Sequence, residues 1–381
     1  MSVSKKIKIF AFTGTRADYP RIKSVLNLIR KNSKFELKIV VTGSHLLKSS
    51  GYTYKDILKD DFKIDYKVKM FKENQTDSLG ENALSFSRCS KGLVRIIERE
   101  KPDYAIVTVD RVETLAIASI CALMNIPILH FQGGEISGTI DESIRHAVSK
   151  LSHFHFVSTP NSKKRLIQMG EQPKNVFLVG CPYTDILKAV MEKKTNNSEK
   201  YCIFIMHSVT TNLDEASKLF ISVYNALENI AKYFKVYCFT PNTDPGFKNI
   251  LNKLKKNKKF ILVKNLESDS FLKLLKHAKF MIGNSSSGIR EAASFKVPTI
   301  DIGSRQNGRE KSLNVINVGF REDEILRKVK YVTTNSHFLK KLKNCENIYG
   351  DGNVAKKVLK ILLNLKLDKT VLEKKFYNIK E

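Results

Sequence analysis

Short apolar runs alternate with longer amphipathic stretches along the whole chain. The apolar runs are rich in β-branched and aromatic residues, which favours strands, whereas the stretches between them have the periodicity of helices. This alternation is typical of βαβ units and a parallel sheet, so we expect an α/β fold. The expected strands are 7–14, 35–43, 104–110, 126–131, 154–158, 176–180, 201–207, 236–241, 260–265, 280–284 and 299–303.

A polar stretch at 192–200 separates these strands into two groups. The chain has 381 residues, which is more than one hydrophobic core usually serves. We therefore expect two domains, 1–185 and 186–362, each a doubly wound parallel sheet. The lysine-rich residues 363–381 are expected to form a helical tail. In such sheets ligands bind at the carboxyl ends of the strands, which is where candidate chemistry should lie.

Composition narrows the class of protein. No run of eighteen apolar residues occurs, and the N-terminus lacks the pattern of a signal peptide, so we expect a soluble cytoplasmic protein. The six cysteines are far apart, without the spacing of metal or redox sites, and we expect them to be buried free thiols.

The formal net charge of +28 suits the attraction of an anionic small substrate. Only 14 of the 66 basic residues are arginines, and no motif of a nucleic-acid reader accompanies the lysines. We therefore expect a solvated lysine-rich surface and neither a nucleic-acid nor a membrane partner.

Two motifs of the first half directly follow expected strands. TGTRADY comes after the first strand and contains Arg16, whose guanidinium is always charged, and Asp18. VDRVE places Asp110 at the carboxyl end of the strand 104–110. The alternative interpretation is structural: a strand–helix turn with a surface arginine in the first motif, and a helix N-cap within a surface charge cluster in the second.

HFQGGEISGTIDESIRH, residues 130–146, is the densest polar segment of the chain. Its glycines allow a close approach of the backbone to a ligand, and Asp141 and Arg145 lie four residues apart on one face of an expected helix. Gln132 and Glu135 precede them. This concentration of polar groups favours an active site over the alternatives, which are a flexible loop with a structural ion pair and ordinary packed histidines.

The second half of the chain also has polar candidate residues directly after expected strands. His207 ends its first strand, and three serines follow the strand 280–284, before a helix expected to begin at about Ile289 with Glu291 in its first turn. Hydroxyls and N–H groups at a helix N-terminus suit a diphosphate, although a helix simply capped by serine has the same pattern. Arg305 follows the next strand, where it suits an anionic group or a structural salt bridge.

Taken together, these motifs resemble one family. GTRADY, VDRVE, HFQGGEISGTIDESIRHA, HSVTT, PNTDPG, NSSSGIREA, GSRQNGRE and IYGDGN follow one another in the order and spacing of the hydrolysing UDP-N-acetylglucosamine 2-epimerases of the sialic and legionaminic acid pathways. The resemblance runs from about residue 8 to 362. It implies a GT-B architecture, with two Rossmann-like domains, an interdomain cleft, the nucleotide bound mainly by the second domain, and a C-terminal helix that packs back across the first.

The resemblance also implies an activity and the residues that perform it. UDP-N-acetylglucosamine and water would give N-acetylmannosamine and UDP through 2-acetamidoglucal, for nonulosonic acid synthesis, without a cofactor or metal. The implied catalytic residues are Asp110, Glu135, Asp141, Gln132 and Arg145. The implied substrate- and UDP-binding residues are Arg16, Asp18, His207, Asn242, Ser285, Ser286, Ser287, Glu291 and Arg305. Relatives of this kind suggest a homodimer or homotetramer.

The chain departs from the family pattern at three positions. Many relatives have Gly in place of Val109 and Pro in place of Ser208, and several have Glu or His in place of Gln132. Glutamine cannot act as a general base, which moves proton transfer to Asp110, Glu135 and Asp141. The VDRVET and HFQGGE forms are also similar to relatives that act on UDP- or GDP-linked N,N′-diacetylbacillosamine, so that substrate stays open.

Two other classes of protein share this expected fold. A GT-B glycosyltransferase binds a UDP-sugar in the same way, but it needs an acceptor pocket where this chain has several acids. A non-catalytic UDP-sugar sensor would keep the serine-rich segment and has no reason to keep the three carboxylates. Both fit the sequence less well than the epimerase.

Overall fold

The computed structural model describes residues 5–16, 18–73, 79–137, 140–193, 198–207, 213–240, 247–263, 266–365 and 371–379. The chain divides into two compact units. Unit 1 comprises Met1–Asp185 and Gly352–Glu381, and unit 2 comprises Ile186–Asp351. The second unit therefore ends earlier than the expected domain 186–362, because the chain returns to unit 1 at Gly352.

Unit 1 contains a seven-stranded sheet whose pairings are all parallel. The strand order is β3-β2-β1-β4-β5-β6-β7, a doubly wound arrangement in which the direction of winding reverses between β1 and β4. Its strands are β1 (Ile7–Thr13), β2 (Phe35–Val41), β3 (Tyr66–Lys67), β4 (Tyr104–Thr108), β5 (Ile128–Phe131), β6 (Phe154–Val157) and β7 (Val176–Leu178).

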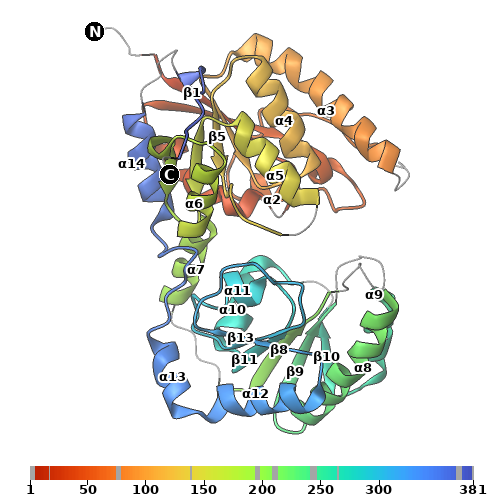
Figure 1. The fold of residues 1–381 in the computed structure, drawn as a ribbon. Helices are drawn as coiled ribbons and strands as arrows, with labels where there is room; N and C mark the ends of the chain where they lie inside the picture. Colours follow the sequence, from red (N-terminus) through yellow and green to blue (C-terminus); the bar gives the residue numbers. More distant parts are fainter. Residues whose placement is uncertain are drawn as a thin grey trace. The chain divides into compact units, whose positions relative to one another are not determined.

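Helices cover both faces of this sheet (Figure 1). The α-helices are α1 (Lys23–Lys31), α2 (Tyr54–Lys59), α3 (Leu79–Glu100), α4 (Val112–Leu123), α5 (Ile140–Leu151), α6 (Pro160–Gln168), α7 (Tyr183–Glu192), which crosses the unit boundary, and α14 (Val354–Asn364). Short 3-10 helices are η1 (Tyr19–Arg21), η2 (Gly43–Leu46) and η3 (Pro173–Asn175).

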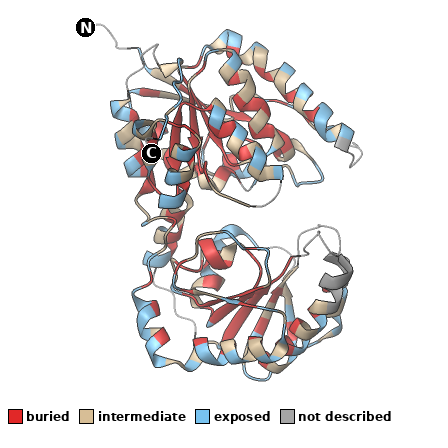
Figure 2. Cartoon of the chain, in the orientation of Figure 1, coloured by how far each residue is buried: buried red, intermediate tan, exposed pale blue. Residues whose placement is uncertain are grey.

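The alternation of side chains along β1 builds two cores in unit 1. Ile9 and Ala11 pack on one face with α1 and α14, whereas Phe10 and Phe12 pack on the other with α3 and α4. Because both faces of such a strand are buried, its sequence is a continuous apolar run, and this run made the strand predictable. Figure 2 shows this buried layer between the helices.

Unit 2 repeats the design with six parallel strands in the order β10-β9-β8-β11-β12-β13, and the reversal lies between β8 and β11. Its strands are β8 (Tyr201–Ile205), β9 (Lys235–Phe239), β10 (Phe260–Val263), β11 (Phe280–Gly283), β12 (Thr299–Ile302) and β13 (Val315–Val318). Its helices are α8 (Leu213–Ile230), α9 (Phe247–Lys256), α10 (Ser268–His277), α11 (Ser287–Arg290), α12 (Glu322–Thr334) and α13 (Ser336–Lys343).

Each of the eleven expected strands is present, and most of them end one or two residues before the expected end. The sequence did not indicate β3 and β13, because β3 has two residues and β13 is only partly buried along its length. The fold class is confirmed: both units are Rossmann-like parallel sheets. All six cysteines are buried and free, as expected. Within the described residues, no helix is long and apolar enough to cross a membrane.

The expected helical tail at 363–381 is wrong for residues 371–379. The last helix, α14, ends at Asn364, and residues 371–379 form no α-helix. Those residues are instead attached to unit 1 by specific contacts, such as the bond from the Tyr377 N–H to the carbonyl of Gly170, 2.8 Å. Helix α14 itself packs beside α1 in unit 1, through Val354, Val358 and Leu362.

Candidate active site

The candidate residues of unit 1 gather where the winding of the sheet reverses. TGTRADY follows β1, and Asp110 follows β4, the two strands that flank the reversal. Gln132 follows β5, the next strand in the sheet. Open α/β sheets bind their ligands in the crevice beyond these strand ends, so the sequence motifs lie where the fold places chemistry.

Asp110 forms an ion pair with Arg145, which projects from α5. The Arg145 side chain is only 5% exposed, and it also donates to the carbonyl of Glu135, 2.5 Å, and to Ser137 Oγ, 3.3 Å. One guanidinium thus joins the end of β4, the loop after β5 and helix α5. Asp141 lies one turn earlier on α5, at its start. All five predicted catalytic residues therefore lie on these connected segments, because Gln132 opens the loop after β5.

Two non-glycine residues at these strand ends adopt left-handed backbone. Val109 has φ 65° and Gln132 has φ 62°. A β-branched residue at positive φ is a conformational outlier, which typically costs about 1–3 kcal/mol and tends to occur at functional sites. Glycine adopts this conformation without strain, which agrees with the glycine that the family resemblance implies at the position of Val109.

The side chain of Gln132 is buried and fully engaged. Its Oε1 accepts a bond from Arg21, 3.0 Å, and its Nε2 lies 3.0 Å from the Sγ of Cys181. Both ends of the amide are therefore held in place, and an amide has no group that can act as a general base.

His130 supports the strained backbone before Asp110. Its Nε2 lies 3.4 Å from the carbonyl of Val109, and its Nδ1 lies 3.2 Å from Ser149 Oγ on α5. A carbonyl oxygen only accepts, so an Nε2–H is the donor toward Val109. The Ser149 hydroxyl beside Nδ1 also donates to the carbonyl of Arg145, 3.0 Å. Burial, reinforced by His155, lowers the pKa of His130 to about 3, which keeps the ring neutral. A Cβ on Gly133 would come within 2.9 Å of this pair, which explains that glycine.

Asp18 shapes the turn after β1. It is buried, and its Oδ2 accepts from the backbone N–H groups of Gly14, 3.2 Å, and Thr15, 3.0 Å. Burial, followed by the nearby charge of Glu113, raises the pKa of Asp18 to about 6. These contacts let Asp18 hold the turn that presents the exposed Arg16. A role of Asp18 in substrate binding stays a prediction.

Glu113 is a buried acid that the sequence analysis did not select. Its side chain is 2% exposed, and burial raises its pKa. It lies against the turn after β1: a Cβ on Gly14 would come within 3.0 Å of its Cγ. An ion pair at 3.7 Å joins it to Arg111. The position of Glu113 in the VDRVE motif could have indicated a role at the site. It did not, because an acid in the first turn of a helix usually faces solvent.

In unit 2, Asn284 organises the corresponding strand ends. It is fully buried at the end of β11, where its Oδ1 accepts from the His207 N–H, 2.7 Å, and its Nδ2 donates to the His207 carbonyl, 2.9 Å. The Asn284 carbonyl accepts from Arg305, 3.1 Å, and from Gln306, 2.9 Å. Predicted binding residues from three strand ends, β8, β11 and β12, are thereby linked.

The serine-rich segment differs in detail from its expected form. Helix α11 begins at Ser287, not at about Ile289, and has only four residues, so Glu291 follows the helix at its C-cap. A single turn has a much smaller dipole than a long helix, so hydroxyl and N–H groups must supply most of any attraction for phosphate. Ser285 is buried, and Ser286 and Ser287 are half-buried. Asn242 lies outside the described residues.

Comparison with known proteins identifies the family. A family model described as UDP-N-acetylglucosamine 2-epimerase matches residues 27–363. The chain belongs to this family. A relative from Legionella pneumophila, named UDP-N,N′-diacetylbacillosamine 2-epimerase (hydrolyzing), is 36% identical over 96% of this chain and 98% of its own. A UDP-N-acetylglucosamine 2-epimerase from Neisseria meningitidis is 35% identical over 87% of this chain and 89% of its own.

A solved structure supports the fold. The crystal structure of a UDP-GlcNAc 2-epimerase from Neisseria meningitidis bound to UDP-GlcNAc matches with a TM-score of 0.80 at 22% identity, over 94% of this chain and all of that one. The protein is thus an enzyme, a hydrolysing nucleotide-sugar 2-epimerase with two GT-B-type sheets.

Proposed function

We propose that this epimerase converts UDP-N-acetylglucosamine and water to N-acetylmannosamine and UDP, as a step of sialic-type acid synthesis. The observation that supports it best is the set of carboxylates and cations on connected segments of unit 1, centred on the Asp110–Arg145 ion pair. The family membership supplies the nucleotide-sugar class of substrate.

The chemistry of the sugar sets what the residues must do. The proton on carbon 2 has no adjacent carbonyl, so its removal must accompany the departure of UDP from carbon 1 through an oxocarbenium-like state. A carboxylate takes that proton and leaves 2-acetamidoglucal. Water then adds at carbon 1, and a proton delivered to the opposite face of carbon 2 gives the manno sugar.

We assign the proton transfers to Asp110 and Asp141, with Glu135 as the third acid of the set. Arg145 orients Asp110, and Gln132 contributes polar contacts without moving a proton. Each of the transfers requires a carboxylate within hydrogen-bond reach of carbon 2 or of its proton donor.

We assign the binding of UDP to unit 2, through His207, Ser285, Ser286, Ser287, Glu291 and Arg305, with Asn242 from the PNTDPG motif. Arg16 of unit 1 adds positive charge for the diphosphate. The support is the network of Asn284, which fixes the backbone of His207 and the loop of Arg305 relative to the serines. Positive charge and N–H donors around the leaving diphosphate stabilise the charge that develops as its bond breaks.

The alternative substrate is UDP- or GDP-linked N,N′-diacetylbacillosamine, with the same chemistry at carbons 1 and 2. The relatives that act on the two sugars are 36% and 35% identical to this chain, so identity does not separate them. The test is to measure nucleotide release from each of the three compounds under one set of conditions. A kcat/KM at least tenfold higher for UDP-N-acetylglucosamine supports the proposal. A higher kcat/KM for a nucleotide-linked diacetylbacillosamine would make that sugar the substrate instead.

A further inference from the structure

The C-terminal segment, residues 371–379, contacts the rest of unit 1 without forming an α-helix. The N–H of Tyr377 donates to the carbonyl of Gly170, 2.8 Å, and Gln172 Nε2 donates to the carbonyl of Lys375, 3.1 Å. The ring of Phe376 occupies the space where a Cβ of residue 170 would lie, and Gly170 also has φ 86°. These contacts fix the backbone that directly follows Lys374.

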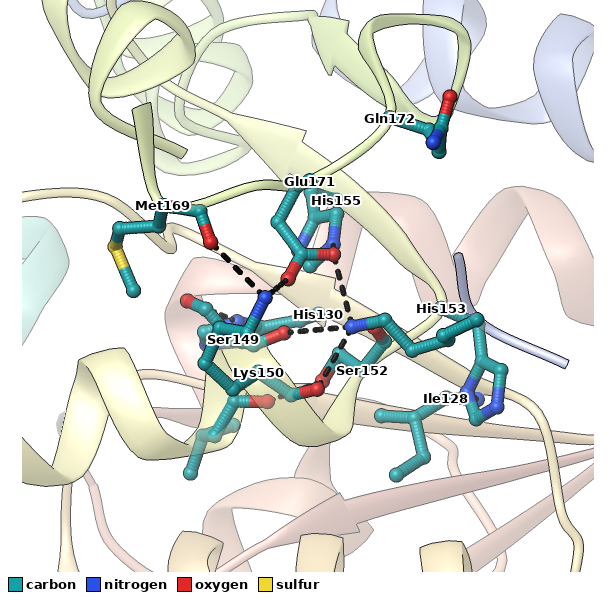
Figure 3. Close-up of polar contacts among 12 residues, drawn as sticks. Ile128, His130, Ser149, Lys150, Ser152, His153, His155, Met169, Glu171 and Gln172 are labelled. Carbon is teal, nitrogen blue, oxygen red and sulfur yellow. Dashed lines mark hydrogen bonds and ion pairs between the residues drawn. The ribbon is translucent and has the colours of Figure 1, made fainter. Parts of the chain in front are cut away.

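The ammonium of Lys374 caps the C-terminus of α5. It donates to the carbonyls of Ser152, 2.5 Å, and Lys150, 2.7 Å, and lies 3.5 Å from that of Ser149. Figure 3 shows Ser149, Lys150 and Ser152 of this helix end, together with Glu171. The last carbonyls of a helix have no hydrogen-bond partner within the helix, and they form the negative end of the helix dipole. A cation at this position supplies hydrogen bonds to the carbonyls and is attracted by the dipole.

Glu171 holds this cation in place. Its carboxylate, 3% exposed, lies 2.8 Å from the ammonium of Lys374, 2.7 Å from that of Lys150 and 3.0 Å from the Nε2 of His155. Burial alone would raise the pKa of Glu171, but the bond from His155 and the two lysines outweigh it and lower the pKa to about 2. The side chain of Lys374 is 27% exposed, so its charge is partly shielded from water.

Helix α5 connects this cap to the candidate catalytic residues. Asp141 lies in its first turn and Arg145, which pairs with Asp110, in its middle. Ser149 in its last turn bonds His130, whose other nitrogen reaches the carbonyl of Val109, the residue before Asp110. A displacement of the C-terminal end of α5 would therefore move Asp110 through two sets of contacts, one made by Arg145 and one made by His130.

We propose that Lys374 is a positioning residue of the active site: from the far end of the chain, it fixes α5 and thereby the geometry of Asp141, Arg145 and Asp110. The inference rests on the proposed function for the roles of those residues. Because the effect concerns the geometry of proton transfer in unit 1, and UDP binding is assigned to unit 2, the loss should fall on kcat and leave KM nearly unchanged.

The test compares Lys374→Met with Lys375→Met and Lys374→Arg in the full chain. Lys375 is an exposed neighbour of the same charge that contributes only a backbone carbonyl, so it is the matched control. We expect kcat to fall at least fivefold in Lys374→Met with KM within twofold, to stay within twofold of wild type in Lys375→Met, and to recover to within threefold in Lys374→Arg.

Hydrogen–deuterium exchange of the same proteins, measured by mass spectrometry, supplies a readout that does not need substrate. Peptides covering 140–152 should exchange faster in Lys374→Met than in Lys375→Met, and peptides of unit 2 should not change. If Lys374→Met is poorly folded, Lys374→Gln replaces it in both measurements, with the same expectations.

Unchanged kcat in the folded Lys374 variant overturns the inference, and so does unchanged exchange of 140–152 or a fall in kcat that Lys374→Arg does not rescue. Failure of the proposed function looks different: wild type would release no nucleotide from any of the three sugars, while the exchange comparison would still show whether Lys374 holds α5.

Discussion

Removal of the Arg145 guanidinium gives the sharpest test of how the site is built. Arg145→Met keeps much of the apolar stem but removes the ion pair with Asp110 and the bonds to Glu135 and Ser137. Asp110, whose side chain is 22% exposed, then keeps its charge without its partner.

The magnitude follows from burial. Removing one partner of a buried ion pair typically costs about 3–5 kcal/mol. The partial exposure of Asp110 places this pair at the lower end, at about 3 kcal/mol. For domains of about 150–250 residues each kcal/mol moves Tm by roughly 2–4 °C, so we expect the unfolding transition of unit 1 to fall by about 6–12 °C. Asp110 would also lose its orientation, and a misplacement of about 1 Å can reduce turnover about a hundredfold.

The assay is thermal unfolding together with nucleotide release, for wild type, Arg145→Met and a control, Arg99→Met. Arg99 lies on α3 of the same unit with a side chain 64% exposed, so its substitution should change stability by less than about 0.5 kcal/mol. A double-mutant cycle with Asp110→Asn should give a coupling of about 1–3 kcal/mol. A Tm of Arg145→Met within 2 °C of the control, or additive effects in the cycle, would refute the reasoning.

Three further predictions follow from the site. Asp110→Asn and Asp141→Asn should each lower kcat about 10²–10⁴-fold, because each removes a proton-transfer group; turnover within a few-fold of wild type would contradict that assignment. Asn284→Ala should weaken UDP binding at least tenfold by calorimetry, because it leaves the backbone of His207 unpaired where it is buried, and unchanged affinity would argue against the network. Because the pKa of Asp18 is raised to about 6, the folded protein holds its proton more tightly than the unfolded chain does, so wild type should lose up to roughly 3 kcal/mol of stability relative to Asp18→Asn as pH rises from 4 to 6.5. Urea unfolding at both pH values checks the sign, and a gain of stability for wild type would be inconsistent with it.

The fold was largely predictable because buried parallel strands are continuous apolar runs. The strands expected at 7–14 and 104–110 appear as β1 and β4, and the motifs after them lie at the reversal of the sheet. Short or weakly buried elements were not predictable. Helix α11 has four residues, which is too short to show a helical periodicity in the sequence.

The contacts that hold the candidate site together could not be predicted from local sequence patterns. The pairing of Arg145 with Asp110 spans 35 residues, and that of Lys374 with the end of α5 spans more than 220. Motif spacing selected Arg145 but suggested Asp141 as its partner, since residues four apart share a helix face. The positive φ of Val109 was also not predictable, because nothing in the residue favours it. Tertiary contacts, not propensity, determine each of these features.

The most direct test of the central claim is the fate of carbon 2 in deuterated water. Purified protein is incubated with UDP-N-acetylglucosamine, and separately with UDP- or GDP-linked N,N′-diacetylbacillosamine, and each reaction is followed by proton NMR. The account predicts free N-acetylmannosamine with deuterium at carbon 2, together with UDP. Nucleotide sugars that stay intact in all three reactions, or a released sugar that keeps its original proton at carbon 2, would contradict it.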